Sequence, residues 1–390
     1  MRSIVIAGAG LAGFRVARAL RDNGFDGQVT IVGKEHHLPY DRPPLSKKVL
    51  SGEMDADECR LPGEVDDITW RLGSAVTGLN LKDHAVETAN GAEIPYDDLV
   101  IATGRRARPW SQPVPHSGIF MLRNLDDPLL LSKTVAEGTP IVIVGAGFVG
   151  CEAAATLRAR GADVTVVDTS ATPMPVIGPA AGEYARSIHE SRGVSWRLGA
   201  QVSSIEGDNE VEAVLLSTGE RLPAKAVLIS IGSIPNTGWV GPGIATTAGT
   251  VHVDRFCRAV DHADTPVDRV WAAGDVASWL HPHAGRHVCV EHWSNARDMA
   301  DVVAHNIITN AADRIGLASS PAFWSDQYEI RIKSAGLVGA ADEHIVISHE
   351  PDKQSMLVEA RKNGEVVGAI GFNETRAILK YQRNLRASAV

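Results

Sequence analysis

The chain has 390 residues, an apolar content of 44% and a formal net charge of −9. A negative balance argues against nucleic-acid binding, which requires a basic surface, and apolar runs no longer than a strand argue against a membrane-spanning segment. We therefore expect a cytoplasmic protein of two or three domains. We expect no signal peptide, because Met1–Ser3 leads directly into a predicted strand.

The first predicted elements are a strand at 4–7, a helix at 11–22 and a strand at 28–32. The turn before the helix reads GAGLAG, a GxGxxG spacing that in this context predicts a dinucleotide site. Its first glycine allows a tight turn, the second lets a pyrophosphate approach the backbone, and the third packs helix against strand. The phosphates then bind N–H groups at the helix N-terminus. The cofactor positions in this turn are Gly8, Gly10, Leu11, Ala12 and Gly13.

A proline-containing segment, PYDRPPLSK at 39–47, follows the second strand. Its adjacent prolines stiffen the backbone and remove N–H donors, which suits the edge of a flavin, with Arg42 offering charge and Lys47 a donor near the ring. Composition alone also fits a surface turn. An acid follows the strand slightly late, at Glu35. The next predicted strand ends at three further cofactor positions, Ala102, Thr103 and Gly104.

A second copy of the pattern follows a proline-rich break at 109–115, with a strand at 141–144, the turn GAGFVG, a helix at 148–159 and a strand at 163–167. Asp168 ends this unit about 20 residues past the glycines, where an acid hydrogen-bonds a ribose 2′-OH, and no arginine follows to bind the 2′-phosphate of NADPH. NADH is therefore favoured; a simple turn cap is the alternative. The nicotinamide-nucleotide positions are Gly145, Gly147, Phe148, Val149, Gly150, Glu152, Asp168 and Gly232.

Two such turns imply two nucleotides in one protein, and the simplest interpretation is a flavin that receives electrons from a nicotinamide. Glu152 begins the helix after the second turn, so we expect it beside the nicotinamide. If Lys47 lies close, the two side chains pair between the cofactor sites, although two unrelated solvated charges are the default for residues so far apart in sequence.

A strand at 270–273 leads into Asp275, which is placed to contact a ribityl hydroxyl. The next helix is expected from about Ser294, with that serine as its N-cap. Its positive end would face the flavin pyrimidine, and Trp293 would pack on the ring or in the core. Between them lies a histidine-rich segment whose spacing fits no closed zinc pattern, so we expect a hairpin and no metal. Its candidate ligands are His281, His283, His287, Cys289 and His292.

The cysteines are Cys59, Cys151, Cys257 and Cys289, and none forms a CxxC pair. This spacing argues against disulfide reduction by a protein dithiol and suits a reducing compartment. The last 70 or so residues change character, with strands at 344–348, 355–360 and 365–371 and a charged helix near 373–385, which predicts an α+β domain. The fold class is therefore α/β, with two Rossmann-like dinucleotide-binding domains and a C-terminal α+β domain.

Several segments together resemble one family. GAGLAG, PYDRPPLSK, ATGRRARP, GAGFVGCE, AAGD, EHWSNARD and PAFWSDQY occur in its order over nearly the whole chain. The family is the FAD-dependent NADH:ferredoxin reductases of oxygenase systems, the group of putidaredoxin reductase and biphenyl-dioxygenase ferredoxin reductase. The resemblance implies a glutathione-reductase-like fold, with an FAD domain at 1–110 and 240–318, an NAD domain at 111–239 and a C-terminal domain at 319–390.

By this resemblance, Lys47 and Glu152 match the pair beside flavin and nicotinamide, and Trp324 and Gln327 fall in the motif that approaches the isoalloxazine. Lys34 stands where an Asp is often found, so Glu35 or backbone groups would contact the FAD ribose. The matching FAD-contact positions are Ala12, Lys47, Val76, Arg123, Asp275 and Trp293.

The resemblance also implies the reaction. NADH would give a hydride to FAD, and single electrons would pass to a 2Fe–2S ferredoxin that supplies a monooxygenase or a ring-hydroxylating dioxygenase. The chain lacks the four-cysteine ligand set of such a cluster, so the cluster would belong to the partner. Two alternatives remain: another acceptor (a rubredoxin, a quinone or oxygen), or an NADH-sensing flavoprotein. Candidates for a ferredoxin-docking patch are Arg105, Arg106, Arg108, Arg331 and Lys333.

Overall fold

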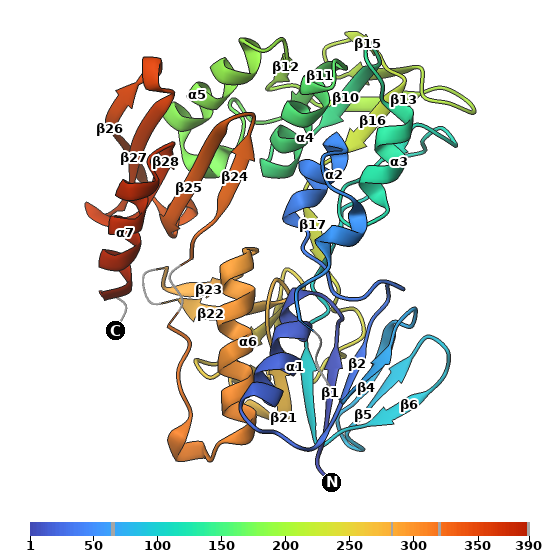
Figure 1. The fold of residues 1–390 in the computed structure, drawn as a ribbon, viewed down its shortest axis with the longest axis vertical. Helices are drawn as coiled ribbons and strands as arrows, with labels where there is room; N and C mark the ends of the chain where they lie inside the picture. Colours follow the sequence, from blue (N-terminus) through green and yellow to red (C-terminus); the bar gives the residue numbers. More distant parts are fainter. Residues whose placement is uncertain (64–66, 282–283, 319–320, 388–390) are drawn as a thin grey trace.

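The computed structural model describes residues 1–63, 67–281, 284–318 and 321–387. Its largest sheet, in the lower half of Figure 1, has ten strands in the described part and is built from both ends of the 1–318 region. Nine strands follow the order β23(Arg286–Val288), β22(Ala277–His281), β19(Thr250–Val253), β20(Arg258–Val260), β21(Pro266–Ala272), β7(Asp98–Ile101), β1(Ser3–Ala7), β2(Gln28–Val32) and β3(Ile68–Arg71), and β18(Thr246–Thr247) pairs with β19.

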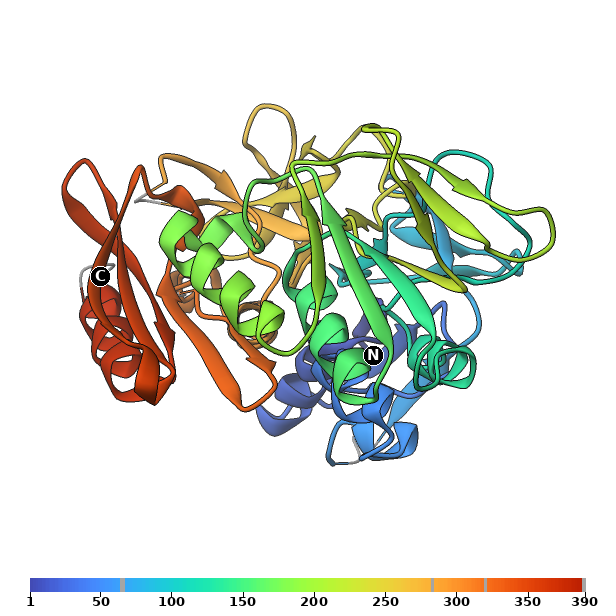
Figure 2. The ribbon, with the colours of Figure 1, turned by 90° about the horizontal axis from the view of Figure 1, so that it is seen from above.

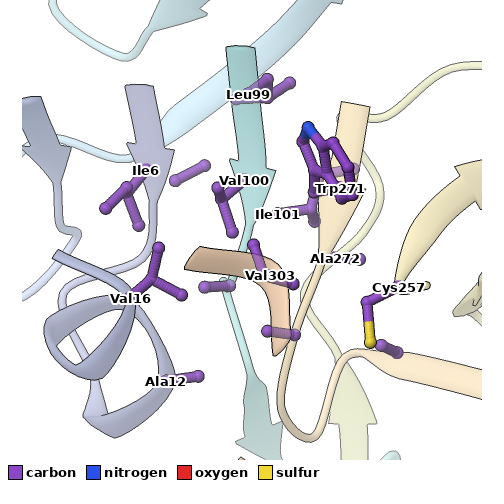
Figure 3. Packing of buried hydrophobic residues seen from close by; sticks show 14 of the residues in the cluster. Ile6, Ala12, Val16, Leu99, Val100, Ile101, Cys257, Trp271, Ala272 and Val303 are labelled. Carbon is purple, nitrogen blue, oxygen red and sulfur yellow. The ribbon is translucent and has the colours of Figure 1, made fainter. Parts of the chain in front are cut away.

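The centre of this sheet is parallel, with β1 between β2 and β7 and with β21 beyond β7. Helices α1(Leu11–Asp22) and α6(Trp293–Ile308) pack together against it. A parallel strand covered on both faces requires an unbroken apolar run, and Ser3–Ala7 reads SIVIA. Figure 3 shows the resulting core, where Val16 and Val303 approach the sheet near Val100. The predicted strand–helix–strand start of the chain is confirmed.

The second sheet repeats this arrangement, because β10(Pro140–Val144) lies between β11(Asp163–Asp168) and β16(Ala226–Ile229) in parallel, as β1 lies between β2 and β7. Three helices belong to this region, namely α3(Asp127–Thr134), α4(Phe148–Ala159) and α5(Pro179–Glu190). The predicted second βαβ unit is therefore confirmed. The five strands follow the order β12(Ser195–Leu198), β11(Asp163–Asp168), β10(Pro140–Val144), β16(Ala226–Ile229) and β9(Ile119–Phe120).

The chain passes between these two sheets twice, and the two crossings pair with each other. β8(Arg105–Ala107) leaves the first sheet and β17(Ser233–Pro235) returns to it, as an antiparallel two-stranded ribbon in which Pro235 faces Arg105. Two small antiparallel sheets complete these regions. They consist of β4(Val76–Asn80), β5(Ala85–Thr88) and β6(Glu93–Pro95), and of β13(Val202–Glu206), β14(Ala213–Leu216) and β15(Arg221–Pro223).

The C-terminal region is an antiparallel sheet with α7(Thr375–Ala387) packed on β25 and β28, and the predicted late strands and helix are confirmed. It lies beside α5 in Figure 2. Aromatic contacts join it to the second region; among them, the ring centroids of Phe148 and Phe323 are 4.5 Å apart, and those of Tyr184 and Phe372 are 5.2 Å apart. Its strand order is β24(Trp324–Gln327), β25(Ile330–Gly336), β28(Glu365–Phe372), β27(Ser355–Lys362) and β26(Glu343–Glu350).

Two local expectations are tested here. The hairpin in the histidine-rich segment is confirmed, since β22 and β23 are antiparallel with Leu280 opposite His287; His283 lies outside the described residues. The expectation that Ser294 caps α6 is wrong. The helix begins at Trp293 with His292 as its N-cap, because the Ser294 hydroxyl donates instead to the Ala322 carbonyl, 3.0 Å away, in the segment leading to the C-terminal sheet.

Within the described ranges, no helix combines the length and hydropathy needed to cross a membrane. In the same ranges no three His, Cys, Asp or Glu side chains are grouped in a way that could hold a metal ion.

Candidate active site

The first glycine of each turn has a conformation that side chains rarely adopt. Gly8 has φ +127° and Gly145 has φ +108°. A Cβ at Gly8 would lie 2.0 Å from the Ala102 carbonyl oxygen, and one at Gly145 would lie 2.2 Å from the Ser230 carbonyl oxygen. Glycine is therefore required at both positions, because each turn passes directly over the strand beside it.

The other two glycines of each turn have opposite surroundings. A Cβ at Gly13 would lie 2.0 Å from the Gly8 carbonyl oxygen, and the equivalent distance from Gly150 to Gly145 is also 2.0 Å, so helix and strand are in close contact. By contrast, apart from the glycine's own chain neighbours, no atom of the described residues lies within 4 Å of a Cβ built on Gly10 or on Gly147.

Both of these open glycines are helix N-caps without a side-chain hydrogen bond, Gly10 for α1 and Gly147 for α4. The first N–H groups of each helix are thus without a capping side chain, and the space in front of them is clear. Helix N-termini of this kind bind phosphate groups. Each turn therefore fits the pyrophosphate of a dinucleotide.

Arginines gather near the end of the first sheet. Arg42 pairs with Glu35 at 2.9 Å and donates to the Arg123 carbonyl oxygen at 2.5 Å, while Arg123 pairs with Asp275 at 3.3 Å. Burial, together with the Arg42 charge, lowers the pKa of Arg123. Each of the two guanidinium groups thus has a carboxylate partner. Glu35 also accepts a 2.5 Å hydrogen bond from Tyr40, so its carboxylate is already engaged.

The start of α6 contributes an unpaired nitrogen to the same region. The His292 Nδ1 is buried and has no hydrogen-bond partner among the described residues. Burial lowers the pKa of His292 to about 4, so the ring is neutral at physiological pH. A buried polar atom without a partner carries a free-energy penalty, which a bound polar ligand would remove.

Two tryptophans from distant segments of the chain lie close together at the start of α6. Trp293 of α6 and Trp324 of β24 have ring centroids 6.4 Å apart at an interplanar angle of 67°. The Trp293 indole donates to Asp41 at 2.8 Å, and Trp324 remains 39% exposed. Of two further expected positions, Thr103 is hydrogen-bonded to Asn236 in both directions, and Val76 is half-buried at the start of β4.

The structure brings Lys47 and Glu152 together. The Lys47 Nζ lies 2.8 Å from a Glu152 carboxylate oxygen, and both side chains are largely buried. Lys47 follows the short helix η1(Pro43–Ser46), and Glu152 lies in the first turns of α4. The pair thus joins the segment after the first glycine turn to the helix that begins at the second.

Two serines that sequence reasoning missed complete this arrangement. The Ser46 hydroxyl donates to the Glu152 Oε2 at 2.5 Å, and the Ser325 hydroxyl donates to the Oε1 at 2.7 Å. One signal was available for the second serine. Strand periodicity puts Ser325 and Gln327 on the same face of β24, and both are buried, which is unusual for polar side chains.

Asp168 contacts the second glycine turn directly. Its carboxylate accepts hydrogen bonds from the Ala146 N–H at 2.6 Å and the Ser170 N–H at 2.7 Å. The side chain is half-buried at the end of β11, and it braces the second glycine turn.

One docking candidate is wrong. The Arg105 side chain is only 11% exposed and pairs with Glu291 at 3.1 Å, because β8 places it against β17, where it also donates to Ser233. Arg106, Arg108 and Arg331 are exposed and Lys333 is half-buried.

This geometry corresponds to known proteins. The family model described as "Pyridine nucleotide-disulphide oxidoreductase" matches residues 2–300, and a "Reductase C-terminal" model matches residues 322–390. The chain belongs to this oxidoreductase family. The resemblance expected from the motifs, and the fold class, are confirmed.

The similarity to known relatives covers most of this chain. Rhodocoxin reductase of Rhodococcus erythropolis is 36% identical, over 88% of this chain and 80% of the relative. The biphenyl dioxygenase system ferredoxin–NAD(+) reductase component of Paraburkholderia xenovorans is 33% identical, over 96% of this chain and 90% of the relative. The crystal structure of the covalent putidaredoxin reductase–putidaredoxin complex matches with a TM-score of 0.89 and 29% identity, over 99% and 93% of the two chains.

Unlike the disulfide reductases for which the family is named, this member has four free cysteines. The Cys289 sulfur lies 3.2 Å from the Asp275 carbonyl oxygen. Burial, with Glu291 nearby, raises the pKa of this thiol to about 12. The reactive thiolate is therefore scarce at neutral pH.

This pKa predicts slow alkylation of Cys289. Because the pKa rises from 9.0 to about 12, the thiolate fraction at pH 8 is about 1,000-fold lower than for an ordinary thiol. We expect iodoacetamide to leave Cys289 unmodified in the folded protein at pH 8, as measured by mass spectrometry, and to modify it in 8 M urea, the control. Equal rates in both conditions would contradict the assignment.

Proposed function

We propose that this protein is an FAD-dependent NADH:ferredoxin reductase. One observation carries the proposal: two open, uncapped glycine turns lie on two parallel sheets, and the Lys47–Glu152 ion pair connects the segments that follow them. Separate sheets also support the proposed division into an FAD domain (1–110 and 240–318), an NAD domain (111–239) and a C-terminal domain (319–390).

A bound FAD supplies the conversion between a two-electron donor and one-electron acceptors. The protein's part is to bind and orient both nucleotides. The N–H groups of α1 and α4 would hold the pyrophosphates, and Arg42 and Arg123 would offset charge near the first of them. Lys47 and Glu152 would order the contact between flavin and nicotinamide. Trp293 and Trp324 would flank the ring and limit access of water.

The acceptor we propose is a 2Fe–2S ferredoxin that serves an oxygenase. Relatives named as ferredoxin–NAD(+) reductase components of dioxygenase systems, and a solved complex of putidaredoxin reductase with putidaredoxin, support this assignment. The free cysteines suit a cytoplasmic location, where thiols stay reduced.

The test is an anaerobic titration of purified protein with NADH and, separately, NADPH, followed by addition of 2Fe–2S ferredoxins. We expect a flavin absorbance spectrum that NADH bleaches and that recovers quickly once ferredoxin is added. A colourless protein that takes up no FAD would refute the proposal. A long-lived reduced state that no ferredoxin reoxidises would indicate an NADH sensor, and fast recovery with oxygen or a quinone alone would indicate another acceptor.

Asp168 gives a prediction about nucleotide choice. We expect Asp168→Ala to raise the dissociation constant for NADH about tenfold, through loss of a charge-assisted hydrogen bond, and to change that for NADPH less, since the carboxylate repels a 2′-phosphate. Because the side chain also braces the turn, Asp168→Asn is the matched variant: it keeps an acceptor oxygen but removes the charge. An unchanged ratio of NADH to NADPH affinity in both variants would disprove the ribose assignment.

The exposed arginines give a prediction about docking. The double variant Arg106→Gln/Arg108→Gln should slow ferredoxin reduction about threefold to tenfold at low salt and less at high salt, because steering by exposed charges is screened. Reduction of ferricyanide, a small acceptor, is the internal control and should not change. Equal loss of both activities would contradict docking at these residues.

A further inference from the structure

A line of buried polar groups runs from Glu152 into the contact between the second and C-terminal sheets. The Ser325 hydroxyl donates to Glu152, and the Gln327 amide nitrogen lies 3.0 Å from the Ser325 oxygen. The Gln327 carbonyl oxygen lies 2.8 Å from the His189 Nε2, and the Tyr328 hydroxyl lies 3.3 Å from the His189 Nδ1. Ser325 and His189 are fully buried and Gln327 almost so.

The direction of these hydrogen bonds follows from the carboxylate at their end. Glu152, paired with Lys47, can only accept, so Ser325 must donate its one hydroxyl proton to it. The Ser325 oxygen then accepts from the Gln327 amide, which leaves the Gln327 carbonyl oxygen facing His189. His189 must therefore carry its proton on Nε2 and accept from Tyr328 at Nδ1. Burial lowers the pKa of His189 to about 4, in keeping with a neutral ring.

Each donor in this line therefore points toward Glu152. Two distant segments of the chain hold the carboxylate: Ser46 and Lys47, which follow the first glycine turn, and Ser325 in the C-terminal sheet. Apolar side chains pack in the same core, among them Val166, Ile330 and Phe372. Polar groups in such a core are costly unless satisfied, and these satisfy one another only in this arrangement.

We propose that Ser325, oriented by Gln327 and His189, is a positioning residue that fixes the rotamer of Glu152 against Lys47. This inference rests on the proposed role of Glu152 in ordering the nicotinamide. Ser325 belongs to the C-terminal sheet, so the position of that sheet affects how quickly NADH reduces the flavin. Ser325 has this effect through Glu152 and need not contact either nucleotide itself.

The test compares Ser325→Ala with Ser325→Thr, which restores the hydroxyl, and with Ser334→Ala. Ser334 is a matched control, because it is a buried serine on the neighbouring strand that accepts from the Phe323 N–H and has no link to Glu152. We expect Ser325→Ala to slow flavin reduction by NADH about tenfold, the effect of one lost hydrogen bond to a charged group, in anaerobic stopped-flow. The NADH dissociation constant should change less than about twofold. Ser325→Thr should recover the rate, and Ser334→Ala should not alter it.

A second readout does not depend on turnover. In oxidised protein labelled with ¹⁵N-histidine, the ring nitrogens of His189 should report the Nε2–H form, and a crystal structure of Ser325→Ala should show the Glu152 carboxylate rotated away from Lys47. A His189 that carries its proton on Nδ1, or an unmoved carboxylate with an unchanged rate, would overturn the inference.

Glu152→Gln, measured in parallel, separates the two proposals. If NADH reduces the flavin slowly in Glu152→Gln but at the normal rate in Ser325→Ala, only the positioning role of Ser325 fails. If Glu152→Gln reduces as quickly as the unmodified protein, the proposed role of Glu152 fails, and the inference fails with it.

Discussion

Replacing Gly147 with valine is expected to abolish useful NADH binding while leaving the protein folded. Gly147 has ordinary negative φ as the N-cap of α4, and within the described part of the chain a Cβ built there meets no atom within 4 Å beyond its chain neighbours. The added side chain would therefore fill the space in front of the helix N-terminus, which is where a pyrophosphate must approach. We expect the dissociation constant for NADH to rise about 100-fold, equivalent to about 2.7 kcal/mol.

The measurement is fluorescence or calorimetric titration of the oxidised flavoprotein with NAD⁺ and of the reduced one with NADH. Gly238→Val is the matched control, because Gly238 also has open space around its Cβ position but lies outside both turns. FAD content and thermal midpoint should match the unmodified protein in both variants. Tight NADH binding by Gly147→Val would show that the second turn does not hold the nucleotide.

Replacing Glu152 with glutamine is expected to have a large effect on both stability and rate. The amide keeps the shape but puts an N–H₂ group toward Lys47 or one of the serines, all of which donate to the carboxylate. Breaking a buried pair from one side leaves an uncompensated charge, which costs about 3–5 kcal/mol. We expect a loss of unfolding free energy near the lower end of this range, since Lys47 keeps some solvent contact, and flavin reduction by NADH about 100-fold slower.

Urea unfolding and anaerobic stopped-flow measure the two effects, and the double variant Lys47→Met/Glu152→Gln separates them. Removing the ammonium as well leaves no stranded charge, so stability should largely return. The rate should stay low, because neither ordering group is present. A double variant that regained the rate together with stability would assign the pair a purely structural role.

The glycine turns could be predicted from sequence because their requirements are local. A positive φ at Gly8, contact between helix and strand at Gly13 and open space at Gly10 all arise within one βαβ unit, and hydrophobic periodicity identifies such units well. The second turn follows the same logic. The two turns, the strands around them and the helices after them were therefore readable residue by residue.

The chemistry between the turns was less readable, because it depends on which distant segments the fold brings together. Ser325 lies 173 residues from Glu152, and Arg105 lies 186 residues from Glu291. No local pattern distinguishes a serine that donates to a carboxylate from a serine that faces solvent, or an arginine held by an ion pair from one free to dock a partner. The sequence predicts the Lys47–Glu152 pair only if the fold brings its two motifs, PYDRPPLSK and GAGFVGCE, close together.

The ribbon of β8 and β17 has a consequence for how this architecture can be rearranged. The chain leaves the first sheet and rejoins it at residues that are already hydrogen-bonded partners, with Ala107 opposite Ser233. The 125 residues between them thus form an insertion whose two ends lie side by side in the folded protein. Closely spaced ends are what make insertion tolerable, so we expect this segment to accept exchange at this one seam for the corresponding segment of a relative.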